Sequence, residues 1–184
     1  MHILRGMRKR RELKDGASYH VYALINRHEY LLQEVFIKKL FMVILNRAKK
    51  KYRFQIGNYC IMDNHIHFIL KPLKGECLSA IMQWILGVFA QKYNRTFDLH
   101  GHVWYDRFKS KIIIDFRQYL HTFIYISNNP VKAGMIGTPV DYPFSGIFDL
   151  QKGITNLMER PPNRVLRVLW SELYFRKNLP GNGE

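Results

Sequence analysis

The order of strand-like and helix-like segments is the feature that most constrains how this chain can fold. Runs rich in β-branched and aromatic residues, typical of strands, lie at 19–25, 54–62, 65–71 and 108–114. Apolar residues recurring every three or four positions predict helices at 34–51, 78–95, 117–129 and around 164–174. In chain order this predicts an α+β fold, a ferredoxin-like or RRM-like βαββαβ antiparallel sheet, followed by a further helix that carries Tyr125.

Positive charge is the second constraint. The 184 residues include 29 Lys and Arg against 14 Asp and Glu, a formal net charge of +15 at pH 7. Such a surplus implies an anionic partner, with nucleic acid the first candidate and an anionic membrane surface the second. Because no apolar run approaches the ~20 residues of a spanning helix and no signal peptide is evident, we expect no membrane association. The two cysteines, Cys60 and Cys77, indicate a reducing cytoplasm.

The sharpest short motif is His65-Ile66-His67, at the start of the third predicted strand. Residues two apart on a strand point to the same face, ~7 Å apart at their Cα atoms, so both imidazoles can converge on one metal ion. An exposed or hydrogen-bonded pair is the alternative for an isolated motif of this kind. A second motif with the same spacing, His100-Gly101-His102, lies in a polar loop, where we expect an incidental pair.

Tyr125 and Asn129 could add a tyrosine and a third metal ligand to the two histidines. They are four residues apart and share one face of the predicted helix. Pro130 disfavours a helical conformation for the residue before it, which places Asn129 at a helix end, where its amide oxygen could ligate a metal. Alternatively, Asn129 caps the helix and Tyr125 packs in the core. Together with the two imidazoles, they predict a three-ligand site for Mg²⁺, Mn²⁺ or Zn²⁺ beside a tyrosine.

Such a site suits chemistry on a phosphodiester. A divalent ion polarises the phosphate and stabilises charge in the transition state, and a neighbouring cation lowers the cost of forming a tyrosine phenolate. Attack by Tyr125 would give a covalent phosphotyrosine and divide one transesterification into two steps. His121, one turn before Tyr125, could assist proton transfer, with a packing or surface role as the alternative.

Basic and aromatic residues near the last predicted strand indicate nucleic-acid binding. Alternating basic side chains can follow a phosphate backbone, and aromatic rings offer stacking platforms for bases; a solvated outer face is the alternative. The predicted contacts are Trp104, Arg107, Lys109 and Lys111. A general electrostatic footprint is expected from the basic residues in and just after the first predicted helix, which are Lys38, Lys39, Arg47, Lys49, Lys50, Lys51 and Arg53.

Four segments carry a pattern that extends over most of the chain. They are residues 62–70 (MDNHIHFIL), 104–110 (WYDRFKS), 125–135 (YISNNPVKAGM) and 141–145 (DYPFS). In order and spacing they resemble the HUH single-tyrosine transposases, and most of all the REP-associated tyrosine transposases. Asp63 stands where that family usually has proline. The resemblance covers one domain at 18–148, which lies between a basic arm at 1–17 and a basic tail at 149–184.

The resemblance implies a metal-dependent endonuclease and strand transferase that acts on single-stranded, hairpin (REP-like) DNA. It implies Tyr125 as the catalytic nucleophile, which forms a 5′-phosphotyrosine and frees a 3′-OH. It implies His65, His67 and Asn129 as ligands of Mg²⁺ or Mn²⁺. It also implies a prokaryotic cytoplasmic protein associated with the nucleoid. Insertion-sequence relatives work as dimers that exchange the tyrosine helix, so a homodimer is one expectation and a monomer the other.

Two non-catalytic interpretations remain open. A βαββαβ sheet with basic and aromatic residues is also typical of an RRM-like RNA-binding module, although the strand at 65–71 lacks the aromatic pattern of such modules. A degenerate transposase could bind hairpins without cutting them. Of these classes, the enzyme alone should depend on the Tyr125 hydroxyl.

Overall fold

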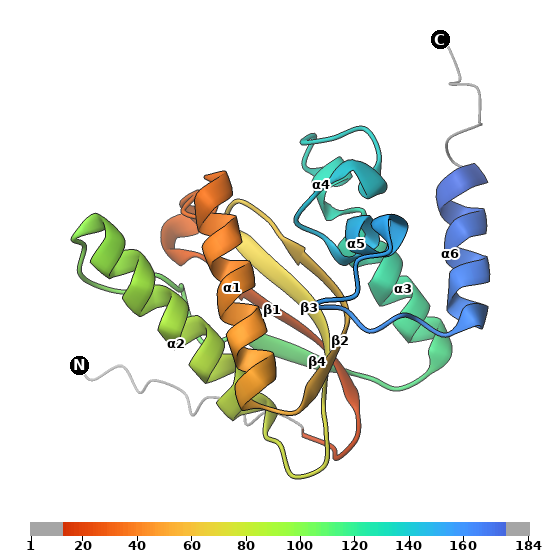
Figure 1. The fold of residues 1–184 in the computed structure, drawn as a ribbon, viewed down its shortest axis with the longest axis horizontal. Coiled ribbons are helices and arrows are strands. Elements are labelled where there is room, and N and C mark those ends of the chain that lie inside the picture. The colour runs from red at the N-terminus through yellow and green to blue at the C-terminus, as the bar shows by residue number, and fades with distance from the viewer. Residues whose placement is uncertain (1–12, 176–184) are drawn as a thin grey trace, which may run out of the picture.

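A four-stranded antiparallel sheet forms the centre of the protein. The computed structural model describes residues 13–175 (Figure 1). The strands are β1 (Ser18–Leu24), β2 (Phe54–Ile61), β3 (His65–Pro72) and β4 (Lys109–Ile113). They pair antiparallel in the order β2-β3-β1-β4. This is the ferredoxin-like α+β sheet that the sequence predicts, with all four predicted strands present.

Two long helices cover one face of the sheet. They are α1 (Val35–Lys51) and α2 (Leu78–Phe97), which lie side by side (Figure 1). Alternate strand residues point towards them, and among these Val21 and Phe68 are fully buried and directly paired between β1 and β3. Phe41 of α1 stacks on Phe68 with ring centroids 6.4 Å apart. This burial fixes the strand register, because a slip of one residue would turn these side chains to the opposite face.

The opposite face carries α3 (Phe116–Ser127), with α5 (Gly146–Lys152) against β2 and α6 (Asn163–Phe175) beside α3 (Figure 1). Short 3₁₀ helices are present at Asn26–His28 and Pro139–Asp141. α6 confirms the helix predicted around 164–174, whereas α5 is not predicted by the sequence analysis. The face opposite α1 and α2 is therefore shared between helices and an open part of the sheet.

The helical path does not end at Pro130. α3 ends at Ser127 with Asn128 as its C-cap, and a short helix, α4 (Asn129–Lys132), begins directly afterwards. The prediction of one helix over 117–129 that Pro130 terminates is therefore wrong. The first turn of a helix leaves its N–H groups without intrahelical partners, so proline begins a new helix there without loss of a hydrogen bond.

Parts of the predicted arm and tail lie outside the described residues. Of the predicted arm at 1–17, residues 1–12 lie outside the described part of the chain. Of the predicted tail at 149–184, residues 176–184 lie outside it. The boundary predicted between 148 and 149 falls within α5. None of the helices in the described part of the chain is long and apolar enough to cross a membrane.

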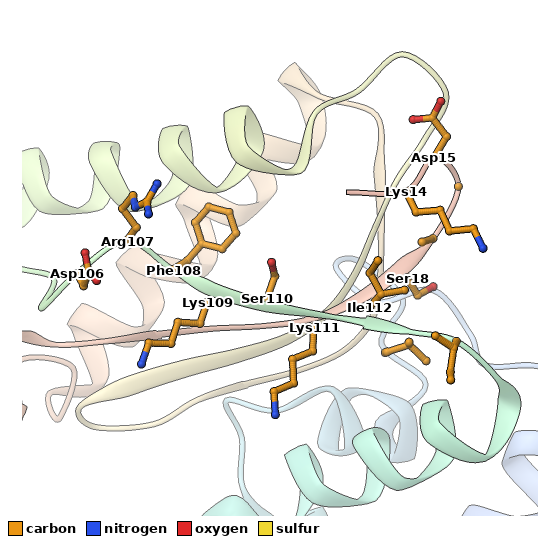
Figure 2. Close-up of a pocket in the computed structure, with 14 residues that line it drawn as sticks. Lys14, Asp15, Ser18, Asp106, Arg107, Phe108, Lys109, Ser110, Lys111 and Ile112 are labelled. Atoms are coloured by element: carbon orange, nitrogen blue, oxygen red, sulfur yellow. The ribbon is translucent and has the colours of Figure 1, made fainter. Parts of the chain in front are cut away.

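The two edges of the sheet differ in how they are covered. Along β2, the Ile61 N–H donates to Phe144 O at 2.9 Å and the Glu159 N–H donates to Ile56 O at 2.8 Å. At the other edge, β4 borders an open cavity of about 1050 Å³ (Figure 2). The edge formed by β4 is therefore accessible to a ligand.

A buried asparagine fastens α3 to the sheet. Asn58 of β2 is fully buried, and its Nδ2 donates to Phe123 O at 3.0 Å and to Ser127 Oγ at 3.1 Å. The preceding Gly57 permits the close approach of α3, because a Cβ at that position would lie 2.6 Å from the hydroxyl of Tyr119. These features of β2 determine where α3, and hence any residue on it, lies over the sheet.

Asn58→Ala is expected to lower the free energy of unfolding by about 2–3 kcal/mol. The variant removes both hydrogen bonds to α3 and leaves the buried Tyr59 N–H, which donates to Asn58 Oδ1 at 2.8 Å, without a partner. Urea unfolding followed by circular dichroism measures the change. The control is Asn46→Ala on the exposed side of α1, which removes one bond to Met42 O and should change stability by less than about 0.5 kcal/mol. An Asn58→Ala protein as stable as the wild type would contradict this account of how α3 is held.

Candidate active site

Three histidines meet on the face of the sheet that α3 partly covers. His65 and His67 lie on β3, and His20 lies on the neighbouring β1. The ring centroids of His65 and His67 are 5.0 Å apart, and those of His67 and His20 are 5.2 Å apart. His67 is almost fully buried, with 5% of its surface exposed. The two histidines of the sequence motif therefore lie side by side.

α3 and α4 bring Tyr125 and Asn129 to the same place. The Tyr125 ring centroid is 5.6 Å from that of His67 and 5.7 Å from that of His20. Asn129 Nδ2 donates to Tyr125 O at 2.9 Å, and the Asn129 side chain also lies beside His65. The structure thus brings together all four residues that the sequence analysis predicts as nucleophile and ligands.

An open cavity of about 450 Å³ lies beside Tyr125. Its lining comes from β1, β3, β4 and α3, and consists of His20, Tyr22, His67, Lys111, His121, Thr122 and Tyr125. Tyr125 is 43% exposed, and the ammonium of Lys132 lies 5.2 Å from its ring centroid. The cavity can therefore admit an anionic group beside the tyrosine, with Lys111 in its lining and Lys132 against the tyrosine ring.

A buried ion pair fixes the turn that precedes the histidines. The ammonium of Lys38, a residue only 3% exposed, donates to Asp63 Oδ1 at 2.5 Å and to Gln33 O at 3.1 Å. The next residue, Asn64, has its Oδ1 2.6 Å from His65 Nδ1. The family that the sequence resembles usually has proline at the position before it. Here Asp63 is held by its ion pair with Lys38. The prediction that Lys38 contributes to a general electrostatic footprint is wrong, because its buried ammonium is paired with Asp63.

All three imidazoles favour the neutral form at neutral pH. Burial lowers the pKa of His67 to about 3, and the proximity of His65 and His20 adds to this effect. Burial, followed by the charge of Lys111, lowers the pKa of His20 to about 4. Burial also lowers the pKa of His65, although the neighbouring Asn129 side chain acts in the opposite direction. Neutral imidazole is the form in which histidine binds a metal.

The donor set fits a divalent metal ion. Asn64 Oδ1 is an acceptor, so its bond to His65 places the ring proton on Nδ1 and leaves Nε2 available. His67 also uses Nδ1 for a protein partner, with His20 Nε2 at 3.0 Å. Metal-binding histidines usually have their second ring nitrogen held in this way. In the described part of the chain, no group of three His, Cys, Asp or Glu side chains is arranged to hold a metal ion, and the further donor beside the two motif histidines is the side-chain amide of Asn129.

Lys109 and Lys111 lie on the same side of the sheet as the histidines. The pairing of β4 with β1 places Lys109 opposite Tyr22 and Lys111 opposite His20, and Figure 2 shows both lysine side chains on one side of β4. Arg107 precedes the strand, and its side chain lies on the other side in the same view. The predicted alternation along one strand therefore holds for the two lysines and is wrong for Arg107.

Trp104 packs against the helical side of the protein. Its ring centroid is 5.5 Å from that of Phe89 and 6.2 Å from that of Phe41. Its indole N–H donates to Leu86 O at 2.9 Å. The adjacent Tyr105 is 64% exposed. The structure does not bring Trp104 together with the two lysines, and the ring that this segment offers to solvent is that of Tyr105.

Sequence analysis missed His20 and Lys132. His20 lies next to His67 because the strand register pairs Tyr22 with His67. The sequence of β1 alone does not reveal this register. Lys132 was missed because the predicted helix ended before Pro130, whereas the helical path continues through α4 and brings Lys132 to the Tyr125 ring. His20 contacts the predicted site from outside the four quoted segments, and Lys132 contacts it from within the segment 125–135.

Comparisons with known proteins identify the family and the fold. A family model described as "Transposase IS200 like" matches residues 14–129, which include the two motif histidines, the tyrosine and the asparagine. The REP-associated tyrosine transposase of Escherichia coli (strain K12) is 25% identical over 147 residues, 79% of this chain and 86% of that protein. A solved structure of a REP-associated tyrosine transposase bound to a REP hairpin has the same fold, with a TM-score of 0.67 and 23% identity over 85% of this chain and 92% of that one. Since the family model matches well over half of the chain, the protein belongs to the IS200-like transposase family.

Proposed function

We propose that this protein is a metal-dependent endonuclease and strand transferase of single-stranded DNA in which Tyr125 is the nucleophile. Membership of a transposase family supports the general class of activity. The observation that carries the finer proposal is the Tyr125 ring, 5.6 Å from His67, next to an Asn129 side chain that is bonded to Tyr125 O and lies beside His65. A tyrosine that is 43% exposed contributes little to the core, so its position beside the imidazoles favours a chemical role.

His65, His67 and Asn129 are the residues that would hold Mg²⁺ or Mn²⁺. Two neutral imidazoles and an amide oxygen are acceptable to both ions, with imidazole favouring Mn²⁺. A bound ion would polarise the scissile phosphodiester and stabilise the charge that develops on it. The chain contributes a rigid frame, because both histidines lie on an interior strand of the sheet and Asn129 is tied to the backbone of α3.

The reaction would be an in-line displacement at phosphorus. A bond forms between Tyr125 Oη and phosphorus, and the bond between phosphorus and the 3′ oxygen breaks. The departing oxygen takes up a proton to become a free 3′-OH, and the phenolic proton passes to solvent or to His121, which lines the same cavity. The resulting 5′-phosphotyrosine retains the energy of the broken bond, so a second 3′-OH can displace the tyrosine and join the strands.

Charge supports a single DNA strand as the substrate. The net charge is +15, Lys111 lines the cavity beside Tyr125, and Lys109 lies two residues away on the same side of β4. Such a row can follow the phosphates of a single strand. The related transposase of known structure is bound to a REP hairpin, so a hairpin with single-stranded flanks is the substrate that we propose.

Covalent attachment to DNA is the expected result that tests this function. The wild-type protein is incubated with a 3′-end-labelled pool of single-stranded hairpin DNA in Mn²⁺ or in EDTA, and the products are separated on a denaturing SDS gel. We expect a labelled protein band and a fragment with an extendable 3′-OH in Mn²⁺, and neither in EDTA. Hairpin binding without any adduct in Mn²⁺ would favour the non-catalytic binding module and contradict the proposed reaction.

A further inference from the structure

We infer that His20 is a positioning residue of the candidate metal site. His20 accepts a hydrogen bond from Nδ1–H of His67 and so keeps the Nε2 lone pair of His67 available to a metal. The inference rests on the proposed function, which makes His67 a ligand. It goes beyond that function by adding a residue outside the sequence motifs and by assigning the position of the proton on two rings.

The contact between the two rings is built into the centre of the sheet. His20 Nε2 and His67 Nδ1 lie 3.0 Å apart, and the ring planes are inclined by 29°. His67 pairs directly with Tyr22 across β1 and β3, so His20 lies two residues along on the same face. β1 and β3 are the two interior strands. Their backbones are held on both sides, so the relative position of the rings is fixed by the fold.

The two motif histidines differ in how their tautomers are set. Asn64 Oδ1 can only accept, so it requires the proton of His65 to be on Nδ1. His20 can accept or donate, and its contact with His67 therefore allows two arrangements. In one, His67 has its proton on Nδ1 and a lone pair on Nε2. In the other, His20 donates, and the proton on His67 Nε2 blocks coordination.

One of the two arrangements is compatible with a shared metal ion. Because His65 has Nε2 available, His67 can join it in binding one ion only if His67 Nε2 is also unprotonated. His20 must then accept at Nε2 and have its own proton on Nδ1. A ligating histidine usually donates its second ring N–H to such a partner, which fixes both tautomer and ring orientation. His20 therefore fixes the tautomer of His67, as Asn64 fixes the tautomer of His65.

Metal affinity provides the first test, measured by titration of the full-length protein with Mn²⁺. His20→Leu removes the acceptor, and we expect Mn²⁺ affinity to fall about 10- to 100-fold. His20→Gln places an amide oxygen near the position of Nε2 and should restore most of the affinity. His102→Leu is the control, since His102 is exposed in the loop after α2 and lines none of the cavity beside Tyr125; its Mn²⁺ affinity should match that of the wild type.

The second test reports the tautomers without any metal. Long-range ¹H–¹⁵N spectra of the histidine side chains in the wild-type protein distinguish a proton on Nδ1 from one on Nε2. We expect His67 to be protonated on Nδ1 and His20 to have its lone pair on Nε2. A His67 ring protonated on Nε2 would overturn the inference, whatever the metal affinity of the variants.

The outcomes separate this inference from the function on which it rests. Mn²⁺ affinity in His20→Leu equal to that of the wild type would refute the role of His20 and leave the proposed metal site standing. A wild-type protein that binds no Mn²⁺ would remove the ligand assignment and the inference together. If circular dichroism shows that His20→Leu does not fold, the rescue by His20→Gln and the wild-type tautomers decide the question.

Discussion

Tyr125→Phe is expected to abolish the covalent protein–DNA adduct. Phenylalanine keeps the ring and has no oxygen to bond to phosphorus, and loss of an essential nucleophile commonly lowers a rate by more than about 10³-fold. The change removes one atom from a residue that is 43% exposed, so stability should stay within about 0.5 kcal/mol of the wild type. The measurement is the SDS-resistant adduct formed over time in Mn²⁺ at equal protein concentration.

The same variant should still bind hairpin DNA. In a strongly basic protein, contacts from cationic side chains to phosphates supply most of the affinity, and Lys109 and Lys111 are unchanged. Fluorescence anisotropy at a fixed salt concentration should therefore give a Kd close to that of the wild type. Binding without adduct in Tyr125→Phe would show that the hydroxyl acts in the reaction and is not required for recognition.

Tyr119→Phe is the matched control for the nucleophile. Tyr119 lies on the same helix, and its hydroxyl is 3.5 Å from Gly57 O, over β2. We expect this variant to form the adduct as the wild type does, and peptide mass spectrometry of the wild-type adduct to locate the nucleotide on Tyr125. An adduct that persists in Tyr125→Phe and is lost in Tyr119→Phe would show that Tyr119, on the side of the helix over β2, is the nucleophile. That result would refute the proposed site.

The sheet could be predicted because its signals are local. Side chains of residues 65–71 point alternately to the two faces of the sheet. Asp63-Asn64 forms a two-residue turn between β2 and β3, in which the Met62 N–H donates to His65 O at 2.9 Å. The spacing of His65 and His67 on one strand similarly predicts neighbouring imidazoles. The break between α3 and α4 was not predicted, because the effect of Pro130 depends on whether the next residues can form a helix of their own.

Contacts between distant segments explain what the sequence could not predict. His20 and His67 are 47 positions apart, and their meeting depends on strand register. Lys38 has the spacing of a surface residue in an amphipathic helix, yet it pairs with Asp63, 25 positions away. Trp104 lies in a segment rich in basic and aromatic residues, and its burial against α1 and α2 follows from tertiary packing. Patterns show which face of an element is apolar, whereas the partner of a polar group depends on the assembled fold.

His67→Ala is expected to have the largest effect on the candidate metal site. Mn²⁺ affinity should fall more than about 100-fold, beyond the 10- to 100-fold typical for loss of an outer partner such as His20, because the variant removes a ligand atom itself. The adduct should disappear while hairpin binding remains. Since His67 is only 5% exposed, His67→Gln is made in parallel, which retains a polar side chain at this buried position. Titration with Mn²⁺ and the SDS gel measure both effects.

The chain offers a control with the same histidine spacing. His100 and His102 are exposed in the loop after α2, and they line none of the cavity beside Tyr125. The double variant His100→Ala/His102→Ala should therefore retain Mn²⁺ affinity and adduct formation. Metal affinity that survives in His67→Ala, or that falls equally in the double variant, would locate the metal away from Tyr125. The tyrosine would then lack the neighbouring cation that its proposed reaction requires, and cleavage would need another source of charge stabilisation.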